Sequence, residues 1–440
     1  MTGSGSDAAA AGQRGATGTN LVPAVGGTRM VPAPDAIARD YVLLALRLDQ
    51  HIQGLVDGYF GPADLKATVD MEQLRPPARL RDDATALRAR LATEVDDAAR
   101  RAWLDAQLIA LETQAAGRAG ETLPYLDHVA RCFAYSPPRY PDAIFDAAAA
   151  RIEELLPGDE PLADRLADWD ARFVVPVDRL PSVVDWLVAR LRATAAADFG
   201  LPDGEDLRVS LVTGQPWSAY NWFDGGRRSR VDVNTDLPVR ASDLIGTIAH
   251  ETYPGHHLEH AWKEADLVDT QGRLESSILL INTPECLISE GLADLGVRFA
   301  SPTEGRVDLL VEIYERAGLS FATDPVATRE AAELTVAIAA ERDRLSAISG
   351  NAAILRHADG RSHVDVVAYL REVGRYPAAR AEKALEFIED PLWRTYVFVY
   401  AEGEALLRRW LEDVAEPERA ARFGRLLHEQ LTPAAVTVPG

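Results

Sequence analysis

The densest group of chemically active side chains lies at residues 250–257, which read His-Glu-Thr-Tyr-Pro-Gly-His-His. Three of the nine histidines of the chain fall within these eight positions, together with a glutamate. Imidazole nitrogens and carboxylate oxygens are the usual ligands of Zn²⁺, and a glutamate directly after a ligand histidine can act as a general base. The pattern therefore predicts a zinc site that includes His250, with Glu251 as the base.

The second ligand is not fixed by the spacing. In the common zinc-hydrolase motif a second histidine follows four residues after the first, but here that position is Pro254. On a regular helix His257 would lie about 20° around the axis from His250 but roughly 10 Å along it, a long reach for a shared ion. Alternatively, Pro254 and Gly255 could bulge the helix by two residues and bring His256 into the ligand position. We favour His256 and keep His257 as the alternative; the histidine left over would support the site or donate to substrate.

The third ligand is expected to be a carboxylate on a following helix. Residues 283–300 begin with Thr-Pro, a good helix start, and place Glu290 in the middle of an apolar, small-residue helix. Asp294 lies one turn later, where it could accept the free ring N–H of a ligand histidine. Glu285 is a weaker candidate, because carboxylates in a first turn simply favour the helix dipole. We therefore predict Glu290 as the third ligand.

These residues resemble a known family. The string His-Glu-x-x-Pro-Gly-His-His, followed by a helix that carries Glu-Gly, is similar to the bacterial domain-of-unknown-function family 885. Members of that family resemble gluzincin-type zinc metallopeptidases and, distantly, the Taq-type carboxypeptidases. The resemblance implies a helical metallopeptidase fold, with His250, His256 and Glu290 as zinc ligands and Glu251 as the general base.

Outer segments of the chain extend this resemblance from about residue 35 onward. Asp57–Pro62 is similar to an N-terminal segment of the family. The stretch that begins at Tyr400 is similar to a tyrosine-glycine region near the C-terminal end of the family. A developing oxyanion needs a donor besides the metal. Tyr400 is our first candidate and His257 our second. Gluzincins also present an edge strand to an extended peptide, and Arg230–Asn234 lies in the expected place for it.

Most other segments show the three-to-four periodicity of amphipathic helices. Residues 206–235 differ, since two stretches alternate apolar and polar residues around Gly225-Gly226, which predicts a small antiparallel sheet directly before the motif helix. Ser242 is the predicted N-cap of that motif helix. Helices are predicted at residues 36–55, 83–118 (as a pair), 142–156, 179–198, 303–318, 324–348, 361–373, 376–390, 393–412 and 416–430.

The predicted fold class is mainly α: one large helical, metallopeptidase-like domain with a small antiparallel β-sheet. Residues 1–32 are rich in Gly, Ala, Thr and Ser and are predicted to form a disordered tail. Residues 33–200 would form an N-terminal helical region, and residues 201–440 a catalytic, metal-binding region with the sheet and the C-terminal helices. The two regions are expected to make one continuous fold from residue 33.

Composition limits the partners and the compartment. A net charge of −22 argues against binding to nucleic acid or to anionic membranes. Cys132 and Cys286 are too few for a disulfide framework, and no stretch approaches the roughly 20 apolar residues that span a bilayer. The N-terminus lacks a basic start followed by an apolar core, so we expect no secretory signal and a cytoplasmic protein. A homodimer is compatible with the sequence.

Together these features predict a zinc-dependent hydrolase of the metallopeptidase class, with Zn²⁺ as cofactor and a short peptide as substrate. The same residues would also serve a zinc hydrolase of a small-molecule amide or ester. A third interpretation is a metal-free helical binding protein with a relic site. The sequence does not favour a di-iron carboxylate bundle, because paired Glu-x-x-His motifs on two helices are absent.

Overall fold

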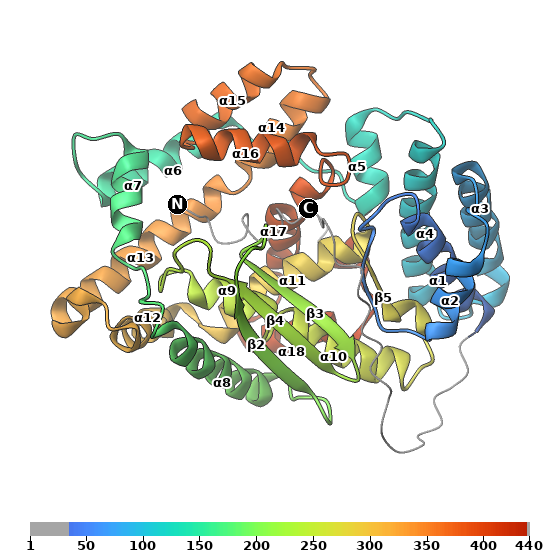
Figure 1. The fold of residues 1–440 in the computed structure, drawn as a ribbon, viewed down its shortest axis with the longest axis horizontal. Helices are drawn as coiled ribbons and strands as arrows, with labels where there is room; N and C mark the ends of the chain where they lie inside the picture. The colour runs from blue at the N-terminus through green and yellow to red at the C-terminus, as the bar shows by residue number, and fades with distance from the viewer. Residues whose placement is uncertain (1–34, 438–440) are drawn as a thin grey trace.

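Helices make up most of the computed structural model, which describes residues 35–437 (Figure 1). The mainly α prediction is confirmed, and a helix forms in each segment where the apolar periodicity predicted one. These helices are α1 (Ala36–Asp49), α3 (Pro77–Glu94), α4 (Ala98–Arg118), α6 (Asp142–Leu155), α8 (Leu180–Asp198), α12 (Thr303–Ala317), α13 (Pro325–Leu345), α15 (His363–Glu372), α16 (Ala378–Glu389), α17 (Val399–Glu412) and α18 (Glu416–His428).

Four further helices were not predicted, and all are short. Three of them begin directly after a proline, which presets the backbone angle for a first turn but offers no side-chain cap. Helices of nine or ten residues contain few turns, which weakens the periodic signal. They are α2 (Ala63–Met71), α5 (Tyr125–Phe133), α7 (Leu162–Ala171) and α14 (Ile348–His357).

The centre of the molecule is a pair of closely packed helices, α11 (Pro284–Ala300) and α17 (Figure 1). A Cβ atom on Gly291 of α11 would lie 2.4 Å from the carbonyl carbon of Gly403 in α17, so neither position tolerates a side chain without displacement. Two glycines thus let the two backbones meet directly. This close approach brings the start of α17 and the 3₁₀ turn before it, η4 (Tyr396–Phe398), beside the middle of α11.

Two small sheets accompany the helices. Strand β1 (Val56–Tyr59) pairs antiparallel with β5 (Ile278–Leu280). The predicted sheet before the motif helix contains β2 (Asp206–Val212), β3 (Ala219–Gly225) and β4 (Arg228–Asn234), in the order β2-β4-β3. The β3–β4 pair is an antiparallel hairpin, as predicted. Strand β2, however, pairs in parallel with β4, so this sheet is mixed rather than wholly antiparallel.

The strand order corrects the predicted substrate-binding edge. Residues Arg230–Asn234 belong to β4, which is hydrogen-bonded on both sides and therefore has no free edge. The hairpin returns β4 between its two neighbours, a placement that alternating hydrophobicity does not reveal. The two edge strands of the sheet are β2 and β3.

The motif lies on three consecutive helices, α9 (Leu244–Glu251), α10 (His256–Lys263) and α11, with η1 (Glu264–Val268) and η2 (Leu274–Ser277) between the last two. The predicted Thr-Pro start of α11 is confirmed, because the Thr283 hydroxyl accepts from the backbone N–H of Cys286. The predicted N-cap Ser242 is wrong. Helix α9 begins one residue later, after Asp243, and the Ser242 hydroxyl donates to the Asp243 carboxylate rather than capping the helix.

A single set of packed apolar side chains extends from Ile37 in α1 to Val436, within η5 (Pro433–Val436), near the end of the described chain. Cys132 and Cys286 are both buried as free thiols.

The predicted tail, residues 1–32, lies outside the described residues, and the predicted division into two regions at residue 200 stays a prediction. The remaining 3₁₀ turn is η3 (Ser320–Thr323). Among the described residues, no helix is both long and apolar enough to cross a membrane.

Candidate metal centre

The turn between α9 and α10 decides which histidine faces His250. The backbone N–H of Gly255 donates to the carbonyl of Ala249, and that of Leu258 donates to the carbonyl of Thr252. Both bonds span six residues instead of the four of an α-helix, so the chain accommodates the two extra residues that the bulge hypothesis required. A Cβ atom on Gly255 would lie 1.9 Å from the His250 carbonyl oxygen, so this turn needs glycine.

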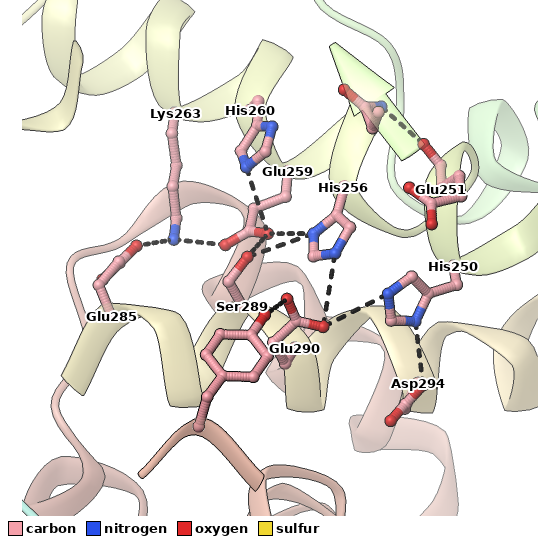
Figure 2. Close-up of polar contacts among 12 residues, drawn as sticks. His250, Glu251, His256, Glu259, His260, Lys263, Glu285, Ser289, Glu290 and Asp294 are labelled. Atoms are coloured by element: carbon pink, nitrogen blue, oxygen red, sulfur yellow. Dashed lines mark hydrogen bonds and ion pairs between the residues drawn. The ribbon is translucent and has the colours of Figure 1, made fainter. Parts of the chain in front are cut away.

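As a result, His256 begins α10 with its ring directed at His250, and the two ring centroids are 4.7 Å apart. Glu290 on α11 completes the group (Figure 2). Its Oε2 lies 3.4 Å from His250 Nε2 and 3.7 Å from His256 Nε2. A zinc ion bound tetrahedrally at 2.0–2.1 Å would hold neighbouring ligand atoms about 3.4 Å apart. The three side chains therefore fit a single divalent ion.

The hydrogen bonding of Glu290 supports this fit. Its Oε1 accepts from the Tyr396 hydroxyl at 2.7 Å, whereas its Oε2 is buried and has no hydrogen-bond partner. A buried, unpaired carboxylate oxygen is costly unless a cation meets it. Burial acts to lower the pKa of His256, but the Glu290 carboxylate outweighs it and raises the pKa to about 10. The group thus attracts positive charge even without an ion.

Each histidine is oriented by a second polar contact on its Nδ1 atom. His250 Nδ1 lies 2.9 Å from Asp294 Oδ1, one turn beyond Glu290 on α11, as the sequence suggested. His256 Nδ1 lies 3.3 Å from the Ser289 hydroxyl, which donates to Glu259 Oε2 at 2.6 Å. Both contacts occupy Nδ1 and leave Nε2 directed at Glu290. Such outer contacts fix ring orientation and tautomer in metal sites.

Beyond Glu259, a buried ion-pair network joins α10 to α11 (Figure 2). Lys263 Nζ donates to Glu259 Oε1 at 2.7 Å and also to the Glu285 carboxylate. Glu285, whose other oxygen accepts from Trp103, is therefore part of this network rather than a ligand of the group. Sequence reasoning missed Glu259 and Lys263, although their spacing of three and seven from His256 places them on its face of a helix.

The structure does not bring His257 to the group. Its side chain points to the other side of α10 and is fully buried; Nδ1 contacts the Ser229 hydroxyl at 2.8 Å and Nε2 contacts Glu205 Oε2 at 3.1 Å. The Tyr253 hydroxyl donates to the same Glu205 oxygen at 2.6 Å. Both ring nitrogens are engaged on the far side and His257 is not among the residues that line the cavity, so its placement favours His256 as the second ligand and does not support His257 as an oxyanion donor. These contacts instead fasten the turn to the sheet.

Glu251 and Tyr400 line the same cavity as the three candidate ligands. Glu251 is the last residue of α9 and is 4% exposed; burial raises the pKa of its carboxyl group. Its backbone carbonyl accepts from the Asn221 side-chain amide at 2.7 Å, which ties the end of α9 to β3. The Tyr400 ring lies 6.3 Å from the His250 ring, and burial raises the pKa of its hydroxyl, so that it remains a donor.

Tyr396 was not foreseen, although it makes the direct contact to Glu290. It lies four residues before Tyr400, and the Gly291–Gly403 contact brings both tyrosines to α11. Only the pairing of two distant helices reveals this role, since 106 residues separate Tyr396 from Glu290.

No protein-family profile matches this chain, and no curated protein matches it. Solved structures that match this chain at low similarity include a "putative lipoprotein" from Colwellia psychrerythraea, with a TM-score of 0.46 and 14% identity, covering 81% of this chain and 65% of that one. A "putative lipoprotein of unknown function" from Shewanella oneidensis has a TM-score of 0.46 and 11% identity, covering 90% and 82%. The M32 carboxypeptidase from Deinococcus radiodurans R1 has a TM-score of 0.37 and 14% identity, covering 89% and 88%. Likeness at this level assigns no activity to this chain.

Proposed function

We propose that this protein is a zinc-dependent hydrolase, and specifically a metallopeptidase that cleaves short peptides. The observation that carries the proposal is the convergence of His250, His256 and Glu290, whose ligand atoms lie within 4.8 Å of one another, with a Glu290 Oε2 that has no hydrogen bond. Two histidines and one carboxylate are the protein ligands of catalytic zinc sites that keep an open position. Glu251 lines the same cavity beside them.

When bound, zinc would lower the pKa of a water molecule and polarise the scissile carbonyl. The protein's own residues would move the protons. Glu251 would take a proton from the attacking water and deliver it to the leaving amine. Burial raises the pKa of Glu251 above its ordinary value, which brings the group closer to the operating pH at which a base both accepts and returns a proton efficiently.

Two further elements would position the substrate. The Tyr400 hydroxyl would donate to the developing oxyanion, because it lines the cavity and stays protonated. Strand β3, one of the two edge strands of its sheet, contributes Ala219, Tyr220 and Asn221 to the cavity wall. An extended peptide laid along this strand would meet the candidate ligands beyond the end of α9, which Asn221 ties to β3. β3 thereby takes the place that the sequence assigned to Arg230–Asn234.

Zinc content and peptide turnover of the purified protein test the proposal together. We expect one zinc per chain, peptide cleavage that a chelator abolishes, and restoration by added Zn²⁺. Glu251→Gln should keep the zinc and lose roughly 10²- to 10⁴-fold in kcat, the usual contribution of a general base. Glu94→Gln, on the surface of α3, is the matched control and should keep both. A zinc-loaded Glu251→Gln protein with undiminished turnover would contradict the proposed role. If the protein turned over only small amides and esters and no peptides, the proposed substrate class would change to small-molecule amides or esters.

A further inference from the structure

The charges that line the cavity are strongly unbalanced. Among the described residues, its wall has no arginine and a single lysine, Lys263, which already donates to Glu259 and Glu285. Apart from the two histidines assigned to the metal, no lysine or arginine of the wall is therefore free to receive a substrate carboxylate. Against this one lysine stand six carboxylates, those of Asp57, Glu251, Glu259, Glu275, Glu285 and Glu290.

Most of these carboxylates already have a partner. Arg100 binds Glu275 through two hydrogen bonds of 2.6 and 3.0 Å, and Lys263 binds Glu259 and Glu285. Glu290 faces the two histidines. Apart from the proposed base, this leaves Asp57 on β1. Its side chain accepts from the Tyr220 hydroxyl, and none of the described lysines or arginines lies within ion-pair distance of it. Burial raises the pKa of Asp57, against the hydrogen bond from Tyr220 and the charge of His256, which act to lower it.

A second acceptor lines the same cavity. The Asn221 amide nitrogen donates to the Glu251 carbonyl at 2.7 Å, so the other atom of this amide must be the oxygen. That oxygen is buried and has no hydrogen-bond partner. Asn221 is on β3, which contacts β1, the strand of Asp57. A buried acceptor without a partner is costly in a native protein, and in a cavity wall it offers a position for a donor group of a bound ligand.

We propose that the cavity takes substrates that carry a primary ammonium group close to the scissile bond, with Asp57 as its charged partner and Asn221 Oδ1 as an additional acceptor. This inference rests on the proposed hydrolase function and names its substrate class. An ammonium group has three donors and no acceptor, which matches a wall of acceptors. Two sources supply this chemistry, a free peptide amino terminus and a lysine side chain.

Matched peptides test the preference on the zinc-loaded protein. A tetrapeptide of small neutral residues is compared with its N-acetylated form and with its C-terminal amide. Acetylation should lower kcat/KM by roughly tenfold to a hundredfold, as for the loss of a charge-assisted hydrogen bond. Amidation should leave kcat/KM unchanged, because the wall has no free lysine or arginine for the carboxylate. Loss of turnover on amidation, or none on acetylation, would overturn the inference.

Variants then locate the ammonium partner. Asp57→Asn should bring the ratio of kcat/KM for free over acetylated peptide close to one, and a ratio on one protein is insensitive to partial unfolding. Tyr220→Phe removes the hydrogen bond but keeps the charge and should retain the preference. Asp64→Asn, at a position 67% exposed, is the matched surface control. An undiminished ratio in Asp57→Asn would remove this residue from the proposal.

Two additional experiments distinguish the source of the ammonium group, and binding from cleavage. Acetylated peptides with lysine or norleucine beside the scissile bond show whether a side-chain ammonium substitutes for the amino terminus. Calorimetric binding of the free and acetylated peptides is measured independently of turnover. Selective binding of the free peptide without cleavage would uphold the ammonium site and refute the hydrolase, whereas cleavage without selectivity would do the reverse.

Discussion

Asp294 provides a graded test of the metal centre, because it touches a candidate ligand without being one. Its Oδ1 lies 2.9 Å from His250 Nδ1, and the two side chains are only 18% and 9% exposed. Asp294→Asn keeps an oxygen that can accept from the ring but removes the charge. Asp294→Ala removes both, so the ring loses its orienting contact.

The size of the effect follows from what each change removes. Loss of an outer contact to a metal-binding histidine typically costs 10- to 100-fold in metal affinity, or about 1.4 to 2.7 kcal/mol. We expect the asparagine variant to lie near the lower value, since the hydrogen bond survives. The alanine variant should lie near the upper value, because a buried ring N–H would also lose its partner.

The assay is a zinc dissociation constant from competition with a chromogenic chelator at fixed pH. The chain offers a matched control in Asp266, whose carboxylate contacts His428 Nδ1 at 2.5 Å outside the cavity wall. Asp266→Asn should leave zinc affinity unchanged. If Asp294→Ala bound zinc as tightly as the unaltered protein, the orientation of His250 by Asp294 would be refuted.

Four further substitutions test the roles of the motif and of its contact with Glu205. His256→Ala should lose zinc, whereas His257→Ala should keep it and lower the melting temperature; the opposite pattern, read by metal analysis, would reverse the ligand choice. Gly255→Ala should lower both zinc content and stability, because the added carbon would lie 1.9 Å from a carbonyl oxygen; a normal metal content would contradict this. Burial acts to raise the pKa of Glu205, but hydrogen bonds, of which that from His257 is the largest, lower the pKa to about 2. The ionised Glu205 therefore stabilises the folded protein above its ordinary pKa of 4.5, and this contribution is lost as the pH falls toward 2. The difference in melting temperature between the unaltered protein and Glu205→Gln should therefore shrink between about pH 6 and pH 3; a constant difference would count against this.

Local signals were sufficient for much of the fold. Apolar periodicity located the long helices, and the Thr-Pro pair located the start of α11. The same signals placed Glu290 and Asp294 one turn apart on that helix, which the structure shows facing His250. Proline and glycine after Glu251 predicted that the helix could not continue regularly. These features depend on neighbours within a few residues, which a sequence displays directly.

Long-range partners could not be read in the same way. Tyr396 reaches Glu290 across 106 residues, and Glu205 reaches His257 across 52. Strand order was equally hidden, because a central and an edge strand can share one alternating pattern, and this misplaced the free edge at β4. The choice against His257 likewise came from its contacts with Ser229 and Glu205, not from its spacing.

The central claim is that one divalent ion is bound by two histidines and a glutamate. A crystal structure of zinc-loaded protein, with anomalous data collected on both sides of the zinc absorption edge, tests it directly. We predict one strong anomalous peak about 2.0 to 2.2 Å from His250 Nε2, His256 Nε2 and Glu290 Oε2. A peak at His257, or none near Glu290 in a protein with stoichiometric zinc, would contradict the account.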